Sequence, residues 1–243
     1  MRVRNASLLA AAAGLLMASA ANAGYSATIQ LIVENADLGT ELGRIEQVIN
    51  EEGATFNWSI LQSYNFGGAT VSEFGIGGIA DPVVSSNFNV AAGPFNTTFT
   101  INSVVVSFGT NETLGRAAAG MTFTDSLNAG TPGTIGLTGL LGGNAYNARY
   151  NGANLFAAGS LLPTTVLTVT PGDTDTYLGQ SDAGFNFLPL GGVANSINSQ
   201  FKFTLSAFDR AAGTSVFEVV PAPGSISLLG LGGLLAFRRR RSA

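Results

Sequence analysis

The clearest indication of the fold is the alternating segment Gln200-Phe201-Lys202-Phe203-Thr204-Leu205-Ser206-Ala207. Apolar residues occupy every second position of it, and the positions between them are polar. Successive side chains of a β-strand point to opposite faces of the sheet. This period of two therefore predicts an antiparallel strand with one buried and one solvated face.

The same period recurs along the chain, in residues 27–31, 55–60, 87–90 and 121–124. Between these runs lie glycine and proline pairs that favour turns, at 67–68, 77–78, 93–94, 132–133, 142–143, 171–172 and 191–192. Many short strands separated by turns predict an all-β protein. We expect residues 24–220 to form one antiparallel β-sandwich with jelly-roll or Greek-key order.

Three segments depart from the simple pattern. Apolar residues have odd numbers from 99 to 101 and even numbers from 104 to 108, so a bulge or strand break is expected at Asn102-Ser103, with a ligand-facing kink as the alternative. Residues 38–49 have apolar side chains at helical spacing and predict a short helix, although Gly39 and Gly43 oppose it and Val48-Ile49 suit a strand equally well. Residues 125–163 have little clear period and predict long loops around one or two strands.

The N-terminus has the three parts of a secretory signal peptide. Arg2 and Arg4 form a positive region, residues 8–17 are apolar, and Ala21-Asn22-Ala23 is a small-residue cleavage site before Gly24. We therefore expect residues 1–23 to be removed on export.

The C-terminus contains a second targeting signal. Pro221-Ala222-Pro223-Gly224 is followed by an uncharged apolar stretch, residues 225–237, and then by Arg238, Arg239, Arg240 and Arg241. A helix of this stretch is roughly 20 Å long and holds a thinned bilayer if the arginines snorkel. The arginines resist translocation and stay cytoplasmic, which places the preceding domain outside.

Residues 219–241 resemble the PEP-CTERM sorting segment of bacterial surface and matrix proteins, with Pro221-Ala222-Pro223 in place of the usual Pro-Glu-Pro. The resemblance implies an exosortase-type membrane protease as partner, cleavage near the proline box, and transient anchoring in the inner membrane. The cell envelope or extracellular space is then the destination. It also implies a structural or adhesive role in exopolysaccharide or biofilm, and a carbohydrate-binding module is the alternative.

Composition narrows the function further. Residues 24–220 contain all fifteen acidic residues but only five cations, so the domain has a formal charge of −10 and repels nucleic acids. The chain has no cysteine and no histidine, which removes thiol chemistry, the Ser–His pair and the usual zinc ligand. We expect no enzymatic activity, no cofactor and no metal.

Three weaker candidate sites remain. Tyr146, Arg149 and Tyr150 offer rings and a guanidinium group for a glycan patch, unless they form an ordinary edge strand; Trp58 and Tyr64 are similar candidates. Asp173 and Asp175, with Asp182 further on, offer oxygens to calcium, although aspartates also suit a solvated turn. A carboxylate pair, or Lys202 as a base, represents the hydrolase alternative.

Overall fold

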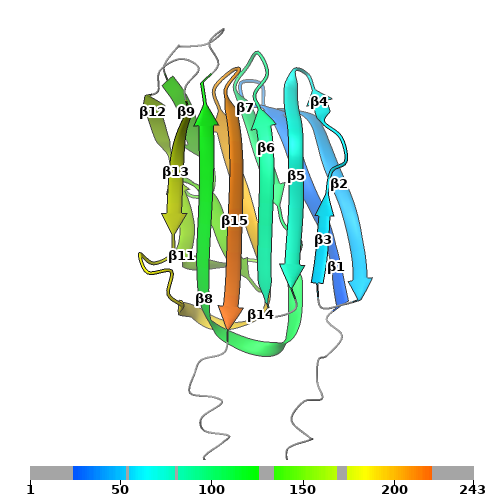
Figure 1. Cartoon of the computed structure of the whole chain (residues 1–243), viewed down its shortest axis with the longest axis vertical. Helices are drawn as coiled ribbons and strands as arrows, with labels where there is room; N and C mark the ends of the chain where they lie inside the picture. Colours follow the sequence, from blue (N-terminus) through cyan, green and yellow to red (C-terminus); the bar gives the residue numbers. More distant parts are fainter. Residues whose placement is uncertain (1–23, 53–54, 80–81, 126–133, 169–173, 221–243) are drawn as a thin grey trace, which may run out of the picture.

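The computed structural model describes residues 24–52, 55–79, 82–125, 134–168 and 174–220. Within these ranges the protein is all-β, with fifteen strands and no helix, and every strand pair is antiparallel. The strands form one curled sheet whose two layers face each other (Figure 1). The predicted all-β antiparallel class is confirmed, and the facing layers are consistent with a β-sandwich.

The first layer has the order β3-β5-β6-β15-β8-β13, with β4 beside β5. Its strands are β3 (Thr55–Ser59), β4 (Tyr64–Phe66), β5 (Ala69–Ile79), β6 (Val83–Ala91), β8 (Val106–Thr124), β13 (Thr174–Gln180) and β15 (Arg210–Val220).

The second layer has the order β2-β1-β7-β14, continued by β10 and β11 and by β9 and β12. Its strands are β1 (Gly24–Asn35), β2 (Thr40–Glu52), β7 (Thr97–Asn102), β9 (Thr134–Gly139), β10 (Asn144–Tyr150), β11 (Asn154–Pro163), β12 (Thr165–Thr168) and β14 (Leu188–Leu205).

A long antiparallel ribbon connects the layers. Residues 83–91 pair with 218–210, residues 97–102 pair with 205–200, and the pairing continues irregularly to Gly115 and Leu188. The ribbon bends between the layers at 92–96 and 206–209, which follow β6 and β14. Beyond this ribbon β8 pairs with the other side of β15, so β8 takes part in both layers.

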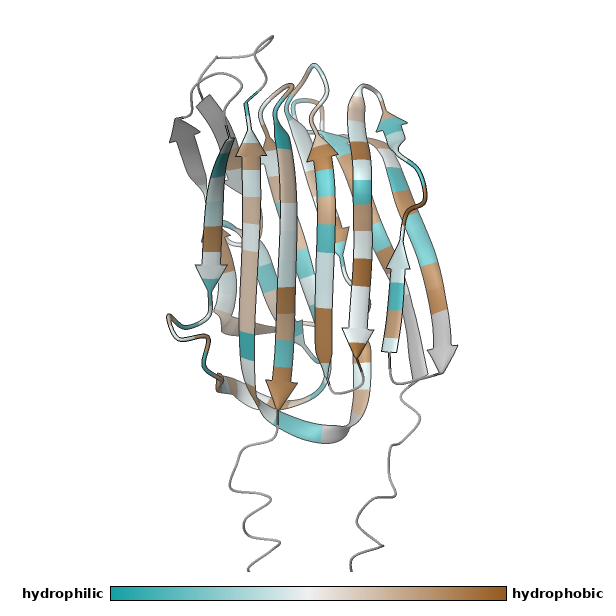
Figure 2. Cartoon of the chain, in the orientation of Figure 1, coloured by the Kyte–Doolittle hydropathy of each residue, from teal (hydrophilic) through white to brown (hydrophobic). Residues whose placement is uncertain are grey.

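The core lies between the layers and is rich in phenylalanine. Phe201 and Phe203 of β14 are buried, and their rings lie 5.0 and 5.7 Å from the ring of Phe88 on the opposite layer. Figure 2 shows the alternating hydropathy along the strands that supplies this core. Gly213 makes room for Phe88, because a β-carbon there would lie 2.3 Å from the Phe88 ring.

The predicted strand break at Asn102-Ser103 is confirmed. β7 ends at Asn102 and β8 begins at Val106. In between, the Ser103 amide donates to the Ser199 carbonyl at 2.9 Å, and Ser103 Oγ accepts from the Ser199 amide at 2.7 Å. The Ser103 hydroxyl thus takes the place of one backbone acceptor in the ladder. The alternation of inward and outward side chains changes parity here while the Ser199 amide stays hydrogen-bonded.

Two expectations about secondary structure are wrong. Residues 40–52 form β2, a full-length partner of β1, and not a helix. Ile45 and Ile49 are buried while Val48 is exposed, so the apolar spacing that mimics a helix comes from an edge strand with a solvated outer side. Residues 125–163 contain three strands, β9 to β11, and not loops around one or two.

The predicted signal peptide and the predicted C-terminal sorting segment lie outside the described residues. The first and last described residues, Gly24 and Val220, lie at the same end of the molecule (Figure 1). Within the part of the chain that the structure describes, no helix is long and apolar enough to cross a membrane.

Candidate functional site

The two tyrosines of the predicted glycan patch, Tyr146 and Tyr150, are buried, although the prediction requires them at the surface. The side chains of Tyr146 and Tyr150 are 0% and 7% exposed, and the Tyr146 ring lies 4.9 Å from the ring of Phe201 in the core. Neither ring offers a face to a sugar. The prediction that these two tyrosines stack on a glycan is therefore wrong for this structure, because their shared face of β10 is the inner one.

The Tyr146 hydroxyl belongs to a polar cluster between the layers. Burial raises the pKa of Tyr146 well above its ordinary value, and the nearby hydroxyls of Ser215 and Ser199 oppose part of this rise. Ser215 also bonds Ser86 of the neighbouring strand at 2.7 Å. The cluster brings together side chains of β10, β14, β15 and β6, but within the described residues the hydroxyls of Tyr146 and Ser199 have no hydrogen-bond partner.

Arg149 lies on the opposite face of β10, which is the outer face of the second layer. It is the cross-strand partner of Asn198, and Asn147 two residues earlier is the partner of Gln200. Lys202 lies on the same outer face of β14, opposite Thr100, as expected for its place in an alternating strand. The cationic part of the predicted patch is therefore separated from its aromatic part.

Four amides on this outer face form what we call the amide row: Gln30 of β1, Asn102 of β7, Gln200 of β14 and Asn147 of β10. Each is the direct cross-strand partner of the next. The Gln200 amide donates to Asn102 Oδ1 at 2.7 Å, and the Asn102 amide donates to Gln30 Oε1 at 3.1 Å. The row therefore crosses four adjacent strands at one level of the sheet.

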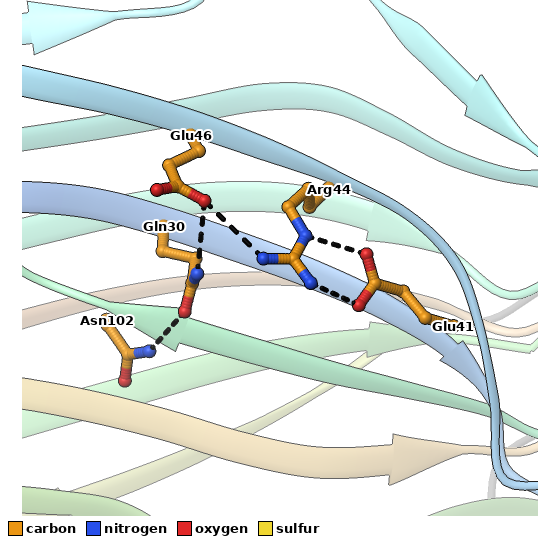
Figure 3. Close-up of polar contacts among 5 residues, drawn as sticks. All are labelled: Gln30, Glu41, Arg44, Glu46 and Asn102. Carbon is orange, nitrogen blue, oxygen red and sulfur yellow. Dashed lines mark hydrogen bonds and ion pairs between the residues drawn. The ribbon is translucent and has the colours of Figure 1, made fainter.

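At the β2 end the amide row meets a charged cluster (Figure 3). Gln30 donates to Glu46 Oε2 at 3.4 Å, and Arg44 lies 3.5 Å from the same carboxylate. Arg44 also donates two bonds, of 2.7 and 2.6 Å, to Glu41, and this bidentate contact lowers the pKa of Glu41. These charges are exposed, so they contribute little stability, but they fix the side-chain directions.

At the β10 end three buried polar atoms have no hydrogen-bond partner among the described residues: Asn147 Oδ1, Asn198 Oδ1 and Arg149 Nε. In the same part of the chain no carboxylate lies within 4.0 Å of Arg149 or Lys202. Unsatisfied buried groups are costly and are rare in native structures. Amides and a guanidinium with spare bonding capacity are groups that bind hydroxyls.

The other aromatic candidates belong to packing. Trp58 is half-buried and meets Phe74 edge-on at 5.6 Å between ring centroids. Tyr64 stacks on Phe66 at 6.1 Å.

The calcium candidates give no cluster in the described residues. Asp173 lies outside them, and Asp175 on β13 is exposed, with Oδ1 accepting from the Thr176 amide at 2.7 Å. Asp182 caps its own loop by accepting from Gly184 and Asn186, and its bond from the Asn186 side chain is the main cause of its lowered pKa. Among these residues no group of three acidic side chains is placed to hold a metal ion.

Acidic pairs at close range do exist, because Glu34 and Glu41 are cross-strand partners. Glycoside hydrolysis needs one carboxyl whose pKa is raised so that it donates a proton. Arg44 lowers the pKa of Glu41 instead, so Glu41 is suited to charge neutralisation and not to acid catalysis.

The outer face of the first layer contains two shallow hollows of about 230 and 280 Å³. Both are lined by Gly120, Leu178 and Thr214. Leu178 is 72% exposed and lies over Gly120, where a β-carbon would be 2.7 Å from it. Alternation predicts the strands here, but the hollows arise from small residues on neighbouring strands and have no local sequence signal.

Comparison with known proteins does not assign a family. No protein-family model and no curated protein matches the chain. Among solved structures, the chain is similar to the infectious bursal disease virus Gx strain at 9% identity, covering 86% of this chain and 69% of that chain, with a TM-score of 0.25. It is also similar to a structure described as "CBM4 structure and function" at 15% identity, covering 56% of this chain and 81% of that one, with a TM-score of 0.21. TM-scores this low support no inference about function.

Proposed function

We propose that the protein is an exported surface or extracellular-matrix protein with a structural or adhesive role in exopolysaccharide. Residues 1–23 direct export, and residues 225–237 with Arg238–Arg241 anchor the chain transiently in the inner membrane. An exosortase-type protease then acts near Pro221-Ala222-Pro223-Gly224. Support comes from the resemblance of residues 219–241 to PEP-CTERM segments and from the order of charged and apolar residues at both termini.

The observation that carries the adhesive role is the amide row. A level of the sheet with four consecutive amides, flanked by Arg149 and Lys202, suits contact with a polymer rich in hydroxyls. The formal charge of −10 disfavours nucleic acid and anionic lipid as partners. The rolled ribbon of residues 83–115 and 188–218 supports a jelly-roll sandwich as the fold that displays this face.

A carbohydrate-binding module is the second candidate function, and the unsatisfied atoms at the β10 end of the row favour it. A matrix role needs only multiple weak contacts, whereas a module binds a defined oligosaccharide. Saturable binding of a short oligosaccharide with a defined stoichiometry is expected only for the module. Nothing in the arrangement of the described carboxylates favours a hydrolase.

Intact mass of the protein recovered outside the cell tests the sorting proposal. We expect a mass that begins at Gly24 and ends near Pro221–Gly224. A chain lacking residues 225–243 should lose its membrane-bound stage during export. A secreted mass that includes the four arginines, or unchanged membrane association after the deletion, would contradict the proposal.

A further inference from the structure

We propose, building on the glycan-associated role above, that the hydrogen bonds of the amide row form a relay in which each amide donates toward the β2 end. Glu46 sets this direction, and the β10 end of the row binds the hydroxyls of a neutral polysaccharide.

The direction follows from the chemistry of the β2 end. An ionised carboxylate only accepts hydrogen bonds, so Gln30 must present its NH₂ group to Glu46. The Gln30 carbonyl then faces Asn102, which must in turn present its own NH₂ group. The same constraint passes to Gln200, whose NH₂ group bonds Asn102 Oδ1. One carboxylate at the sheet edge thus orients three amides.

The far end of the relay is left rich in acceptors. Within the described residues no group donates to Gln200 Oε1, Asn147 Oδ1 or Asn198 Oδ1. The last two oxygens are buried, so a sugar hydroxyl reaches them only if the terminal torsion of each asparagine, which is soft, rotates on binding. Arg149 Nε, also without a partner, adds one donor beside them.

This set of groups selects the ligand class. A sugar hydroxyl donates to an amide oxygen and accepts from Arg149 at once, so it satisfies both kinds of group. A carboxylate would face three acceptor oxygens on a domain with a charge of −10. Neighbouring strands lie about 4.8 Å apart, so an extended polymer lying along the row meets the half-buried amides of Gln30, Asn102 and Gln200 on successive strands. Asn147 at the end of the row is only 5% exposed.

Binding of the full chain, kept in mild detergent, to a soluble neutral β-glucan and to alginate, a polyuronate, tests the proposal by affinity electrophoresis. We expect retention by the neutral glucan and at least tenfold weaker retention by alginate. Arg149→Met should weaken glucan binding about tenfold, because it removes a charged donor worth about 1.4 kcal/mol or more. Alginate bound as tightly as the glucan, or full binding by Arg149→Met, would overturn the proposal.

Glu46→Gln and Glu41→Gln form a matched pair that tests the relay. Both remove one negative charge from β2 and weaken the contacts of Arg44, which are two bonds to Glu41 and one ion pair with Glu46, but only Glu46 touches the amide row. We expect Glu46→Gln to weaken glucan binding about threefold to fivefold, since its amide no longer fixes the relay, whereas Glu41→Gln stays within twofold. Equal effects of the two variants would refute the relay.

Circular dichroism and thermal midpoints confirm that each variant is folded before binding is compared. The mass of the protein secreted by cells that express the chain, measured together with glucan binding by that secreted protein, separates the two proposals. A correctly processed protein that does not bind the neutral glucan contradicts the relay and leaves the sorting route standing.

Discussion

At the scale of single residues, Tyr146 shows how a correct pattern gives a wrong site. Tyr146 and Tyr150 share a face, as their spacing requires, and Arg149 lies on the other. Which face of β10 is buried depends on the first layer across the core, where Ser215 lies near the Tyr146 hydroxyl, while Phe201 of the neighbouring strand packs against the Tyr146 ring. These partners are more than fifty residues away along the chain, so no local pattern reveals them.

The buried hydroxyl of Tyr146 predicts a loss of stability in alkali. Burial raises its pKa above the ordinary value of 10.0, so between that pH and the folded-state pKa only the unfolded chain ionises at this residue. Its contribution is complete below pH 10 and is lost as the pH rises, by up to about 1.4 kcal/mol per unit.

Tyr146→Phe removes this part of the pH dependence. Because the buried Tyr146 hydroxyl has no hydrogen-bond partner among the described residues, we expect the variant to be within about 1 kcal/mol of the wild type at pH 8 and to be the more stable protein by pH 11. Urea unfolding at both pH values measures it. A difference that stays constant over this range would show that the hydroxyl does not titrate on unfolding.

At the scale of elements, the sequence predicts strands where one face is continuously buried. β14 alternates as expected from Phe201 to Leu205, and the phase change after Asn102 marks the strand break. The spacing in residues 38–49 predicts the wrong element because Leu38 lies largely exposed in the turn, while Ile45 and Ile49 are buried and Leu42 is partly buried against the core. The sequence predicts only one or two of the three strands β9 to β11, because small residues such as Ala145, Ala148 and Gly159 fill buried positions without raising local hydrophobicity much.

For the amide row, the sequence predicts the outward direction of the side chains but not their alignment. Gln30, Asn102 and Gln200 each fall on the polar parity of their strands, so their outward direction is predictable. Their alignment at one level depends on the registers of two strand pairs, which bring together residues from positions 30 to 200. Register is set by turns and by core packing across the whole sheet, and a local pattern does not contain it.

The side chain of Asn151 connects the β10–β11 turn to the irregular part of β14. Asn151 has a positive φ of 49°, and its side chain accepts from the amides of Asn195 and Ser196 and donates to the Val193 carbonyl. Asn151→Ala loses these three bonds and puts alanine, which adopts a positive φ less readily than asparagine, in this left-handed conformation. We expect a loss of about 2–3 kcal/mol in urea unfolding.

Asn151→Gly is the control, because glycine accepts the positive φ but lacks the side chain. It should recover the part of the loss that comes from strain, about 1 kcal/mol, and no more. If the glycine variant is as stable as the wild type, the three side-chain bonds do not hold β14 in place.

At the scale of the whole molecule, the excess of negative charge is the feature that we expect to affect stability. The domain of residues 24–220 has a formal charge of −10, and ion pairs in the described residues involve only Arg44 and Arg116. Like charges spread over a compact body destabilise it by mutual repulsion, which salt screens. A strand such as β13, with exposed Thr174, Asp175 and Thr176, gains from screening without a bound ion.

The thermal midpoint should therefore rise as ionic strength increases from 10 to about 150 mM, where the Debye length shortens to about 8 Å. Sodium chloride and calcium chloride at equal ionic strength distinguish general screening from a specific site at Asp173 and Asp175. Because Asp175 bonds its own backbone and no acidic cluster surrounds it in the described residues, we expect the two salts to give the same midpoint within about 1 °C. A further rise that saturates with calcium, and disappears in Asp175→Asn, would instead identify a calcium site in this region.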